Sequence, residues 1–191
     1  MGEIWGGVGI SCFEWNPIDK NVVAIVTKKT NKLEIWAVDQ GRMIGIMDLK
    51  VAVSLVKWNP HNPAQLIALE KSDNAHEIAR KILYLDYTTN VQKVLSNVMV
   101  NITTIGWHPR RPDFVVLGTG YGQVSITNIT TQVYDAMFVV PQKVQGSKVS
   151  AMVQDIIFSP GEDVFLVIRV DGQIFLYSAE QQEPKAEFEK P

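Results

Sequence analysis

The sequence predicts an all-β fold made of four repeated units, each of them a four-stranded antiparallel meander. An aromatic residue, a polar residue and a proline follow one another four times, as "WNP", "WNP", "WHP" and "FSP". The prolines of these phrases, Pro17, Pro60, Pro109 and Pro160, are spaced by 43, 49 and 51 residues. Short apolar runs separated by turn residues fill the intervals, and helical periodicity is nearly absent, so the repeats are built from strands.

The first run of each unit alternates between polar and apolar residues and ends at the aromatic residue of the repeated phrase. These runs span 10–15, 53–58, 102–107 and 153–158. We expect each to be a strand whose terminal aromatic side chain packs between neighbouring sheets. The polar residue after it can cap the following turn. Proline then ends the strand, because it has no N–H to donate to a ladder.

The second run of each unit is almost continuously apolar, which predicts a strand that is buried on both faces. These runs span 22–27, 66–71, 114–119 and 164–169. A third run follows after turn residues, at 32–38, 81–87, 123–129 and 173–179. The last and less regular runs lie at 42–49, 90–97, 132–140 and 184–190. Four consecutive short strands with turns between them predict one antiparallel meander per unit.

A repeat of this length is typical of propellers and solenoids. Because the units are built from strands, a helical solenoid is excluded and a set of β-propeller blades is favoured. The whole chain, 1–191, then consists of four blades at about 9–49, 50–98, 99–141 and 149–191. Within the last blade, Asp171-Gly172 predicts a tight turn between two strands.

The repeated phrase resembles the WD40-repeat β-propeller family. In that family a strand ends in W-x-P or F-S-P, an apolar strand and a turn follow, and the next strand ends in a Trp-Asp-like pair. The corresponding pairs here are Trp36-Ala37, Leu85-Asp86, Thr127-Asn128 and Tyr177-Ser178. No copy has both residues, and the Gly-His pair that usually precedes the first strand is missing. The chain therefore resembles a divergent member that lacks the hydrogen-bonded His–Asp–Ser/Thr–Trp network.

The resemblance also implies a function and a location. Propellers of this family present rigid rims on which other proteins dock, so we expect a non-catalytic scaffold subunit without a cofactor. Large cytoplasmic scaffolds, including ciliary transport and coat-type complexes, often begin with divergent propellers. The implied location is the cytoplasm, in a ciliary or cytoskeleton-associated assembly.

Four blades are fewer than the seven or eight with which this family closes a ring. An open arc would expose two blade faces, and monomers rarely tolerate apolar patches of that size. Such faces would be lined by residues like Val23, Ile25, Val115 and Leu117. The missing neighbours are further blades of a longer chain, a second copy in a homodimer, or a protein partner. A compact four-bladed ring is the remaining alternative.

Composition and motifs disfavour catalysis and several classes of ligand. The formal net charge of −2 creates no long-range attraction for nucleic acid or an anionic membrane. With three histidines and the lone Cys12, no zinc-binding spacing and no intrachain disulfide exist, and a reducing compartment is favoured. The glycine clusters Gly6–Gly9 and Gly118–Gly122 precede predicted strands, so they indicate hairpin turns rather than phosphate loops. The sequence contains no run of 18 apolar residues, so it predicts no helical membrane span.

Candidate partner-binding residues fall in the loops of the two expected rims. One rim carries an insertion at 72–81 and a longer connection at 141–152. Its candidate residues are Asp73, His76, Glu77, Arg80, Lys81, Lys143 and Lys148. Asn74 and Glu77 match a helix N-cap and its capping-box partner, which predicts a single helical turn. The candidate residues of the other rim are His61, His108, Arg110 and Arg111. They form either a basic patch for an acidic peptide or a set of solvated turns.

Two other functions stay open. An enzyme with its site in a central channel needs ionisable residues on the innermost strands. The sequence offers Glu14, Lys57 and Asp155 there. A phosphoinositide or nucleic-acid reader needs basic residues gathered on one rim. Its best support is a turn of the first blade that contains Lys28, Lys29 and Lys32.

Overall fold

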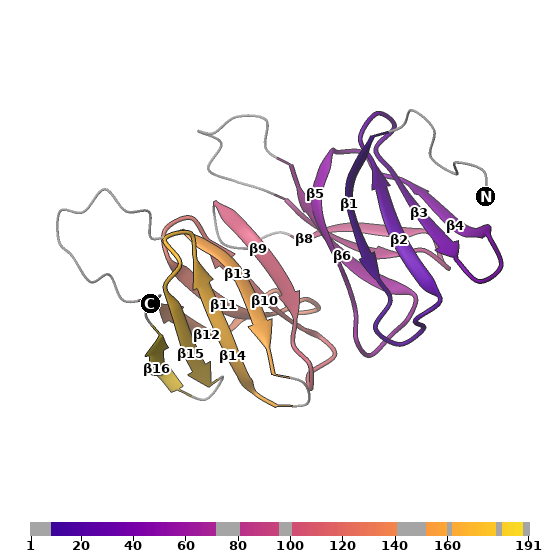
Figure 1. Ribbon diagram of the computed structural model, residues 1–191. Helices are drawn as coiled ribbons and strands as arrows, with labels where there is room; N and C mark the ends of the chain where they lie inside the picture. The colour runs from indigo at the N-terminus through magenta and orange to yellow at the C-terminus, as the bar shows by residue number, and fades with distance from the viewer. Residues whose placement is uncertain are drawn as a thin grey trace. The chain divides into compact units, whose positions relative to one another are not determined.

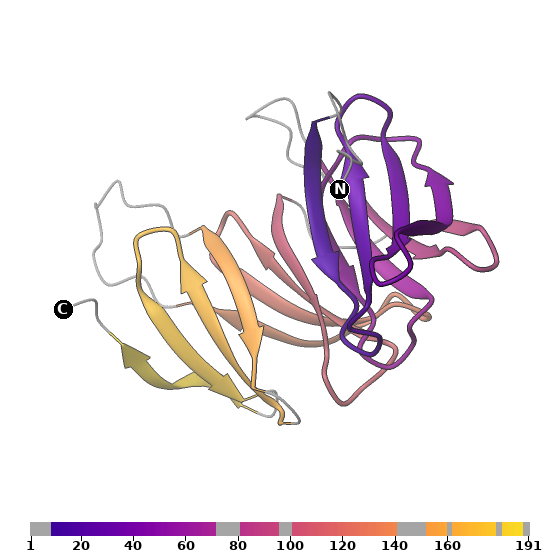
Figure 2. The same ribbon diagram turned by 45° about the vertical axis from the view of Figure 1, so that its right-hand side comes forward.

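The computed structural model describes residues 9–71, 81–95, 101–140, 152–159, 162–178 and 181–188. The regular secondary structure in these ranges consists of β-strands alone. The strands form four antiparallel sheets of four strands each (Figure 1). Within every sheet the strands are hydrogen-bonded in chain order, so each sheet is a meander, as Figure 2 shows from a second side. The predicted all-β class and the four-stranded antiparallel units are confirmed.

The strands begin and end within a few residues of the predicted runs. Sheet 1 consists of β1 (Ile10–Trp15), β2 (Val22–Thr27), β3 (Lys32–Ala37) and β4 (Arg42–Asp48). Sheet 2 consists of β5 (Val53–Trp58), β6 (Gln65–Glu70), β7 (Ile82–Asp86) and β8 (Val91–Leu95). Sheet 3 consists of β9 (Ile102–Trp107), β10 (Phe114–Thr119), β11 (Gln123–Asn128) and β12 (Tyr134–Val139). Sheet 4 consists of β13 (Val153–Phe158), β14 (Val164–Arg169), β15 (Ile174–Ser178) and β16 (Gln181–Phe188).

The chain divides into two compact units, one that contains sheets 1 and 2 and one that contains sheets 3 and 4. In each unit the two sheets pack face to face around a hydrophobic core of their own. The first strands of the two sheets are neighbours, β1 with β5 in the first unit and β9 with β13 in the second.

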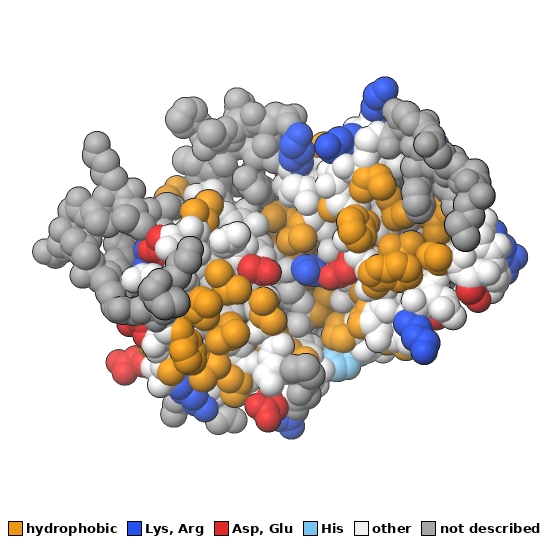
Figure 3. Space-filling model, in the orientation of Figure 1, with side chains coloured by type: hydrophobic (Ala, Val, Ile, Leu, Met, Phe, Trp, Pro, Cys, Tyr) orange, Lys and Arg blue, Asp and Glu red, His pale blue; other side chains and the backbone are white. Residues whose placement is uncertain are grey.

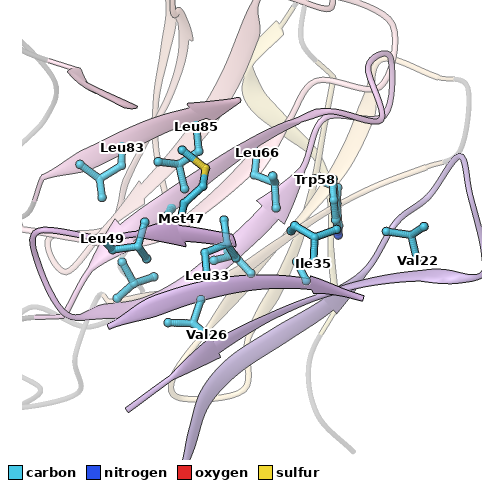
Figure 4. Packing of buried hydrophobic residues seen from close by; sticks show 14 residues of the cluster. Val22, Val26, Leu33, Ile35, Met47, Leu49, Trp58, Leu66, Leu83 and Leu85 are labelled. Atoms are coloured by element: carbon cyan, nitrogen blue, oxygen red, sulfur yellow. The ribbon is translucent and has the colours of Figure 1, made fainter. Parts of the chain in front are cut away.

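The core of the first unit is mainly aliphatic (Figure 4). Sheet 1 contributes Leu33 and Ile35, and sheet 2 contributes Leu66 and Leu85, all with no exposed surface. Alternation along β3 places Leu33 and Ile35 on one face of the strand, so that their polar neighbours point away from the core. Trp58, the aromatic residue that ends β5, belongs to the same cluster and is 3% exposed.

The core of the second unit is rich in aromatic rings. The rings of Phe138 on β12 and Phe165 on β14 are 5.5 Å apart and nearly perpendicular, at 80°. Tyr177 on β15 stacks 5.6 Å from Phe165. Contacts of these geometries add to the free energy gained by burying the rings. Burial raises the pKa of the Tyr177 hydroxyl to about 12, so this group stays protonated at neutral pH.

In sheets 1, 2 and 3 the polar residue of the repeated phrase caps the turn after the first strand, as predicted. Asn16 Oδ1 accepts two backbone N–H groups of its turn, at 2.9 and 3.0 Å. Asn59 Oδ1 accepts the N–H of His61 at 2.9 Å. In sheet 3 a histidine takes this place, and His108 Nδ1 accepts the N–H of Arg110 at 3.2 Å. A short polar side chain therefore compensates backbone donors that the end of the strand leaves unpaired.

The aromatic residue before this cap is buried in some sheets and exposed in sheet 1. Trp58 and Trp107 are buried, with 3% and 6% exposure, but Trp15 is 50% exposed. Trp58 pairs in register with the core residue Leu66, and so it faces sheet 1. Trp15 occupies the same position in sheet 1 and therefore faces away from sheet 2. The expectation that every such residue is covered is wrong for Trp15.

Each first strand has a β-bulge at its second residue, a feature that the sequence did not predict. The extra residues are Ser11, Ser54, Thr103 and Gln154. Two of them bond to the neighbouring sheet of the same unit. Ser11 Oγ donates to the Val53 carbonyl, and Thr103 Oγ1 donates to the Val153 carbonyl, both at 2.6 Å. The bulge re-aims a polar side chain from its own sheet toward the next one.

The second strands are buried as predicted in three sheets and only half so in the fourth. β2 is buried along its whole length, and the central residues of β6 and β10 are buried as well. Along β14, buried and half-buried residues alternate. Phe165 and Val167 point into the core of the second unit, whereas Leu166 and Ile168 lie on the opposite face and stay partly exposed.

The four residues expected to line exposed faces are buried instead. Their exposures are 5% for Val23, 3% for Ile25, and 0% for Val115 and Leu117. All four lie on β2 or β10, which have a paired strand on each side.

The glycine turns agree with the sequence where the structure describes them. Gly122 in the β10–β11 hairpin has φ of +77°, and Gly172 in the β14–β15 hairpin has φ of +86°. Glycine adopts these values without the steric cost that a Cβ would bring. Residues 6–8 of the other glycine cluster lie outside the described residues.

Candidate functional site

Most predicted binding residues of the first rim lie outside the described residues. These are Asp73, His76, Glu77, Arg80, Lys143 and Lys148. The helical turn expected at Asn74 lies there too. Lys81 is described and is exposed at the start of β7. Its N–H donates to Glu70 Oε2 at 3.0 Å, and its Nζ lies 3.7 Å from Glu70 Oε1, so it ties the end of β6 to the start of β7.

Lys81 also borders a small hollow in the first unit, with a volume of about 240 Å³. The hollow is lined by Lys50, Val51, Lys81, Leu83, Gln92 and Val94. Ligand pockets commonly measure about 300–1,000 Å³. The charged lining residues of the hollow are Lys50 and Lys81.

The second predicted set is divided between the units. His61 lies in the first unit, exposed in the turn after β5. His108, Arg110 and Arg111 lie in the second unit, in the turn after β9. Each unit is therefore considered by itself.

His108 is fully buried, so the expectation that it belongs to an exposed basic patch is wrong. Its ring lies 5.2 Å from the ring of Phe158, and its Nε2 lies 3.5 Å from Asp163 Oδ1. Phe158 ends β13 and Asp163 precedes β14, so the imidazole fills a contact between sheets 3 and 4. The capping position between Trp107 and Pro109 turns the side chain back toward the protein, and this is why it is buried.

The two arginines that follow are paired with carboxylates. Arg110 Nη1 lies 3.2 Å from Asp163 Oδ2. Arg111 Nη1 donates to Asp135 Oδ2 at 2.5 Å, and its guanidinium lies 3.4 Å above the ring of Phe114. The hydrogen bond from Arg111 lowers the pKa of the Asp135 carboxyl. Because each arginine has an acidic neighbour, this turn attracts an acidic peptide less strongly than its sequence suggests.

Two ionisable residues of the first strands, Glu14 and Lys57, form a clamp between sheets 1 and 2. Lys57 Nζ lies 3.1 Å from Glu14 Oε1, and Glu14 Oε2 accepts the backbone N–H of Trp58 at 2.7 Å. The Trp58 indole N–H donates to the Glu14 carbonyl at 3.0 Å. Burial raises the pKa of the Glu14 carboxyl, and the Lys57 charge opposes this effect. The carboxylate is thus engaged in joining two sheets.

The third charged residue of the first strands, Asp155, is also engaged. Its Oδ1 accepts the backbone N–H of Ile156 at 2.8 Å and lies 3.4 Å from the Thr104 hydroxyl of sheet 3.

Burial, reinforced by the Glu14 charge, raises the pKa of the Cys12 thiol to about 12, which makes this thiol a poor nucleophile at neutral pH.

Neither a metal-binding cluster nor a membrane-spanning helix occurs in the described part of the chain. In these ranges, no group of three or more His, Cys, Asp or Glu side chains is placed to hold a metal ion. The same ranges contain no helix with the length and hydropathy needed to cross a membrane.

The face of sheet 1 that is turned away from sheet 2 is mainly apolar, and its central polar residue, Glu34, accepts the Trp36 indole N–H at 2.9 Å. It carries Phe13, Trp15, Trp36, Met43 and Ile46, and we call it the leading face. Phe13 is 63% exposed, and Trp15, Met43 and Ile46 are 50%, 44% and 45% exposed. In Figure 3, hydrophobic side chains gather over β1 and β2 of this unit.

The face of sheet 4 that is turned away from sheet 3 is apolar as well, and we call it the trailing face. It carries Ile157, Leu166, Ile168, Ile174, Leu176 and Phe188. Ile157 and Phe188 are 48% and 49% exposed, and the four residues between them are half-buried. Figure 3 shows this second group of hydrophobic side chains over β13 to β15. The continuous apolar run of β14 is the feature of the sequence that indicates this face, because such a run predicts a strand whose two faces are both buried.

No protein-family model matches the chain, and no curated protein matches it either.

Proposed function

We propose that this chain is a set of divergent WD40-like blades of a β-propeller and acts as a non-catalytic platform for protein–protein interaction. The observation that carries the proposal is the pair of apolar faces, the leading face of sheet 1 and the trailing face of sheet 4. Contiguous apolar surface of this kind marks a site that another protein surface covers. The platform then works as a scaffold subunit of a larger cytoplasmic or ciliary assembly.

The way in which the sheets of each unit meet supports their assignment as blades. Propeller blades are four-stranded sheets that pack around a central channel. Here the first strands of paired sheets are neighbours, and the same hydroxyl-to-carbonyl bond joins them in both units. A seven- or eight-bladed ring requires further sheets, and the two apolar faces are where such sheets would pack.

The use of the ionisable residues supports a non-catalytic role. Glu14 and Lys57 neutralise each other between sheets 1 and 2. His108 is buried beside Asp163, and the Cys12 thiol has a raised pKa. Each of these groups stabilises the fold or stays uncharged, which leaves the side chains poorly suited to acid–base or nucleophilic chemistry.

The test is affinity capture from cell extract with the tagged chain and two variants. Phe13→Lys places a charge on the leading face, whereas Tyr121→Lys alters a side chain of similar exposure, 53%, in the β10–β11 turn. We expect the wild type and Tyr121→Lys to hold the same discrete set of proteins and Phe13→Lys to lose it. Identical protein sets for all three chains, or none for any of them, would contradict the proposal.

A phosphoinositide or nucleic-acid reader is the second candidate. Lys28 and Lys29 are both exposed in the β2–β3 turn. Lys32 follows them at the start of β3, and its Nζ lies 3.8 Å from Asp48 Oδ1. Flotation with vesicles that contain anionic lipids, and titration with nucleic acid, would reveal such binding. It should weaken steeply with salt and disappear in the double variant Lys28→Glu, Lys29→Glu.

A further inference from the structure

We propose that the trailing face of one copy of this chain binds the leading face of a second copy, in the way that paired sheets of one unit bind each other. The inference rests on the proposed blade-like arrangement and names the partner of its open faces. It follows from three contacts between paired sheets and from the groups that remain at the two apolar faces. The bond from the bulged residue and the apolar packing occur in both units, and the tryptophan contact occurs in the first unit.

The first contact is the bond from the bulged residue of one sheet to the first residue of the next. Ser11 Oγ donates to the Val53 carbonyl, and Thr103 Oγ1 donates to the Val153 carbonyl, each at 2.6 Å. In sheet 4 the bulged residue is Gln154, whose amide N–H groups are exposed donors. The matching acceptor at the leading face is the carbonyl of Ile10, the first residue of β1.

The second contact is the tryptophan that ends a first strand. The Trp58 indole N–H donates at 3.0 Å to the carbonyl of Glu14, the residue before the last of β1. Trp15 holds the position of Trp58 in the leading sheet and is half exposed. The residue before the last of β13 is Ile157, on the trailing face. A second copy therefore brings the Trp15 indole to the carbonyl of Ile157.

The third contact is apolar and extends across the facing sheets. Within each unit the facing sheets bury continuous hydrophobic clusters. The leading face offers large side chains, Phe13, Trp15, Met43 and Ile46, that stand out from the sheet. The trailing face offers half-buried aliphatic side chains, Leu166, Ile168, Ile174 and Leu176, flanked by the more exposed Ile157 and Phe188.

These contacts select a second copy as the occupant because one chain carries both halves of the same interface. The donor of Gln154 and the acceptor of Ile157 lie on one face, and their complements at Ile10 and Trp15 lie on the other. The contact joins different surfaces of two identical chains. It is therefore heterologous, and it closes into a ring if the rotation between copies allows this.

The experiment measures the mass of the whole chain by light scattering over a range of concentrations. Phe13→Glu alters the leading face, Ile157→Glu alters the trailing face, and Tyr121→Glu is the matched control, since all three side chains are about half exposed or more. The wild type and the control should associate. Each face variant should raise the dissociation constant by about 30-fold or more, as for a central interface residue.

Mixing the two face variants gives the decisive result. Phe13→Glu keeps an intact trailing face and Ile157→Glu keeps an intact leading face, so an equimolar mixture should recover pairs of chains through one good contact. If either variant alone associates like the wild type, the interface joins two identical faces and the proposal is overturned. A wild type that stays monomeric at every concentration overturns it as well.

A milder variant tests the predicted hydrogen bond. Trp15→Phe keeps an aromatic ring on the leading face but removes the indole N–H, so association should weaken several-fold while the melting temperature of the monomer stays unchanged. An unchanged dissociation constant would remove the bond to Ile157 from the proposal.

The outcomes also separate this inference from the proposed function. A monomeric chain that captures partners refutes the inference alone, and an associating chain that captures none refutes the platform.

Discussion

At Gly118 the backbone of β10 approaches sheet 4 more closely than a side chain permits. A Cβ at this position would lie 2.7 Å from Val153 Cγ1 and 2.8 Å from Thr104 Cγ2. Both distances are too short for real carbon atoms, and both neighbours are branched side chains inside a packed region. The absence of one methyl group at Gly118 therefore lets sheets 3 and 4 meet.

We expect Gly118→Ala to lower the free energy of unfolding by about 1–3 kcal/mol, because overpacking forces neighbouring side chains or strands to shift. Gly106→Ala is the matched control, since a Cβ at Gly106 in the adjacent strand meets no atom within 4 Å. Replacing a strand glycine where there is space should leave stability unchanged or raise it by about 0.5 kcal/mol. Urea denaturation of both variants measures the difference, and equal effects would show that the close approach is not required.

Glu14 provides a pH-dependent prediction at the same scale. Burial raises the pKa of its carboxyl, although Lys57 and the N–H of Trp58 oppose this effect. A raised pKa means that the folded chain binds the proton more tightly than the unfolded chain. The contribution of Glu14 to the free energy of unfolding should therefore fall as the pH rises from about 4.3 through the raised value.

The Glu14→Gln variant tests this sign because its amide does not titrate. We expect the stability of the wild type relative to Glu14→Gln to decrease between pH 4 and pH 7, as measured by urea denaturation. A relative stability that grows with pH would instead show that the attraction of Lys57 outweighs the cost of burial.

At the scale of elements, the bulges of β1 and β9 contribute to the way in which paired sheets are joined. Thr103 shows this most clearly, since its hydroxyl reaches the Val153 carbonyl at 2.6 Å and lies 3.1 Å from the Gly118 carbonyl of its own sheet. Ser11 makes the corresponding inter-sheet bond in the first unit. The hydroxyl gives the face-to-face packing a defined register that apolar contacts alone would not.

Thr103→Val should therefore destabilise the second unit by about 0.5–1.5 kcal/mol, since it keeps the shape of the side chain and removes one hydrogen-bond donor. Thr131→Val, at an exposed position in the β11–β12 turn, is the control and should change stability by less than about 0.5 kcal/mol. Thermal unfolding followed by circular dichroism compares the two. A loss at Thr131 as large as the loss at Thr103 would contradict a special role for the bulge.

At the scale of the whole molecule, the chain has two hydrophobic cores of different character. The first is mainly aliphatic, and the second contains the stacked rings of Phe165 and Tyr177 with the ring of Phe138 edge-on to both. Each core is formed by the two sheets of its own unit. Stability should therefore be lost unit by unit when one core is damaged.

Phe165→Ala should cost about 3–5 kcal/mol and Leu33→Ala about 2–5 kcal/mol, because both remove a fully buried side chain. Hydrogen exchange followed by mass spectrometry locates the damage. We expect Phe165→Ala to reduce protection mainly in β9 to β16, and Leu33→Ala mainly in β1 to β8. Equal loss of protection in both units would show that they unfold as one.

The strands themselves were predictable because their signals are local. Alternation, continuous apolar runs and turn residues act within a few positions of one another, so they place β1 to β16 without knowledge of neighbours. The capping role of Asn16 and Asn59 belongs to the same class, since the side chain bonds to backbone only two or three residues away. Gly122 and Gly172 likewise report a local need for positive φ.

The candidate site was much less predictable, because exposure depends on what another part of the chain covers. His108 looked like a member of a basic turn, and the structure buries it against Phe158. Arg111 looked free to bind a ligand, and it pairs with Asp135, a residue of β12. These partners are distant in sequence, and no local pattern reveals them. Several other predicted residues, among them His76 and Lys148, lie outside the described residues.

The sequence by itself determined that this protein is all-β, that it repeats one four-stranded meander four times, and where each first strand turns back. These properties follow from interactions between residues near one another in the chain. Only the tertiary structure decided which faces are covered, that bulged hydroxyls join paired sheets, and that Trp15 is exposed where Trp58 is buried. Those properties depend on which sheet lies against which, since identical phrases in the sequence meet different neighbours in space.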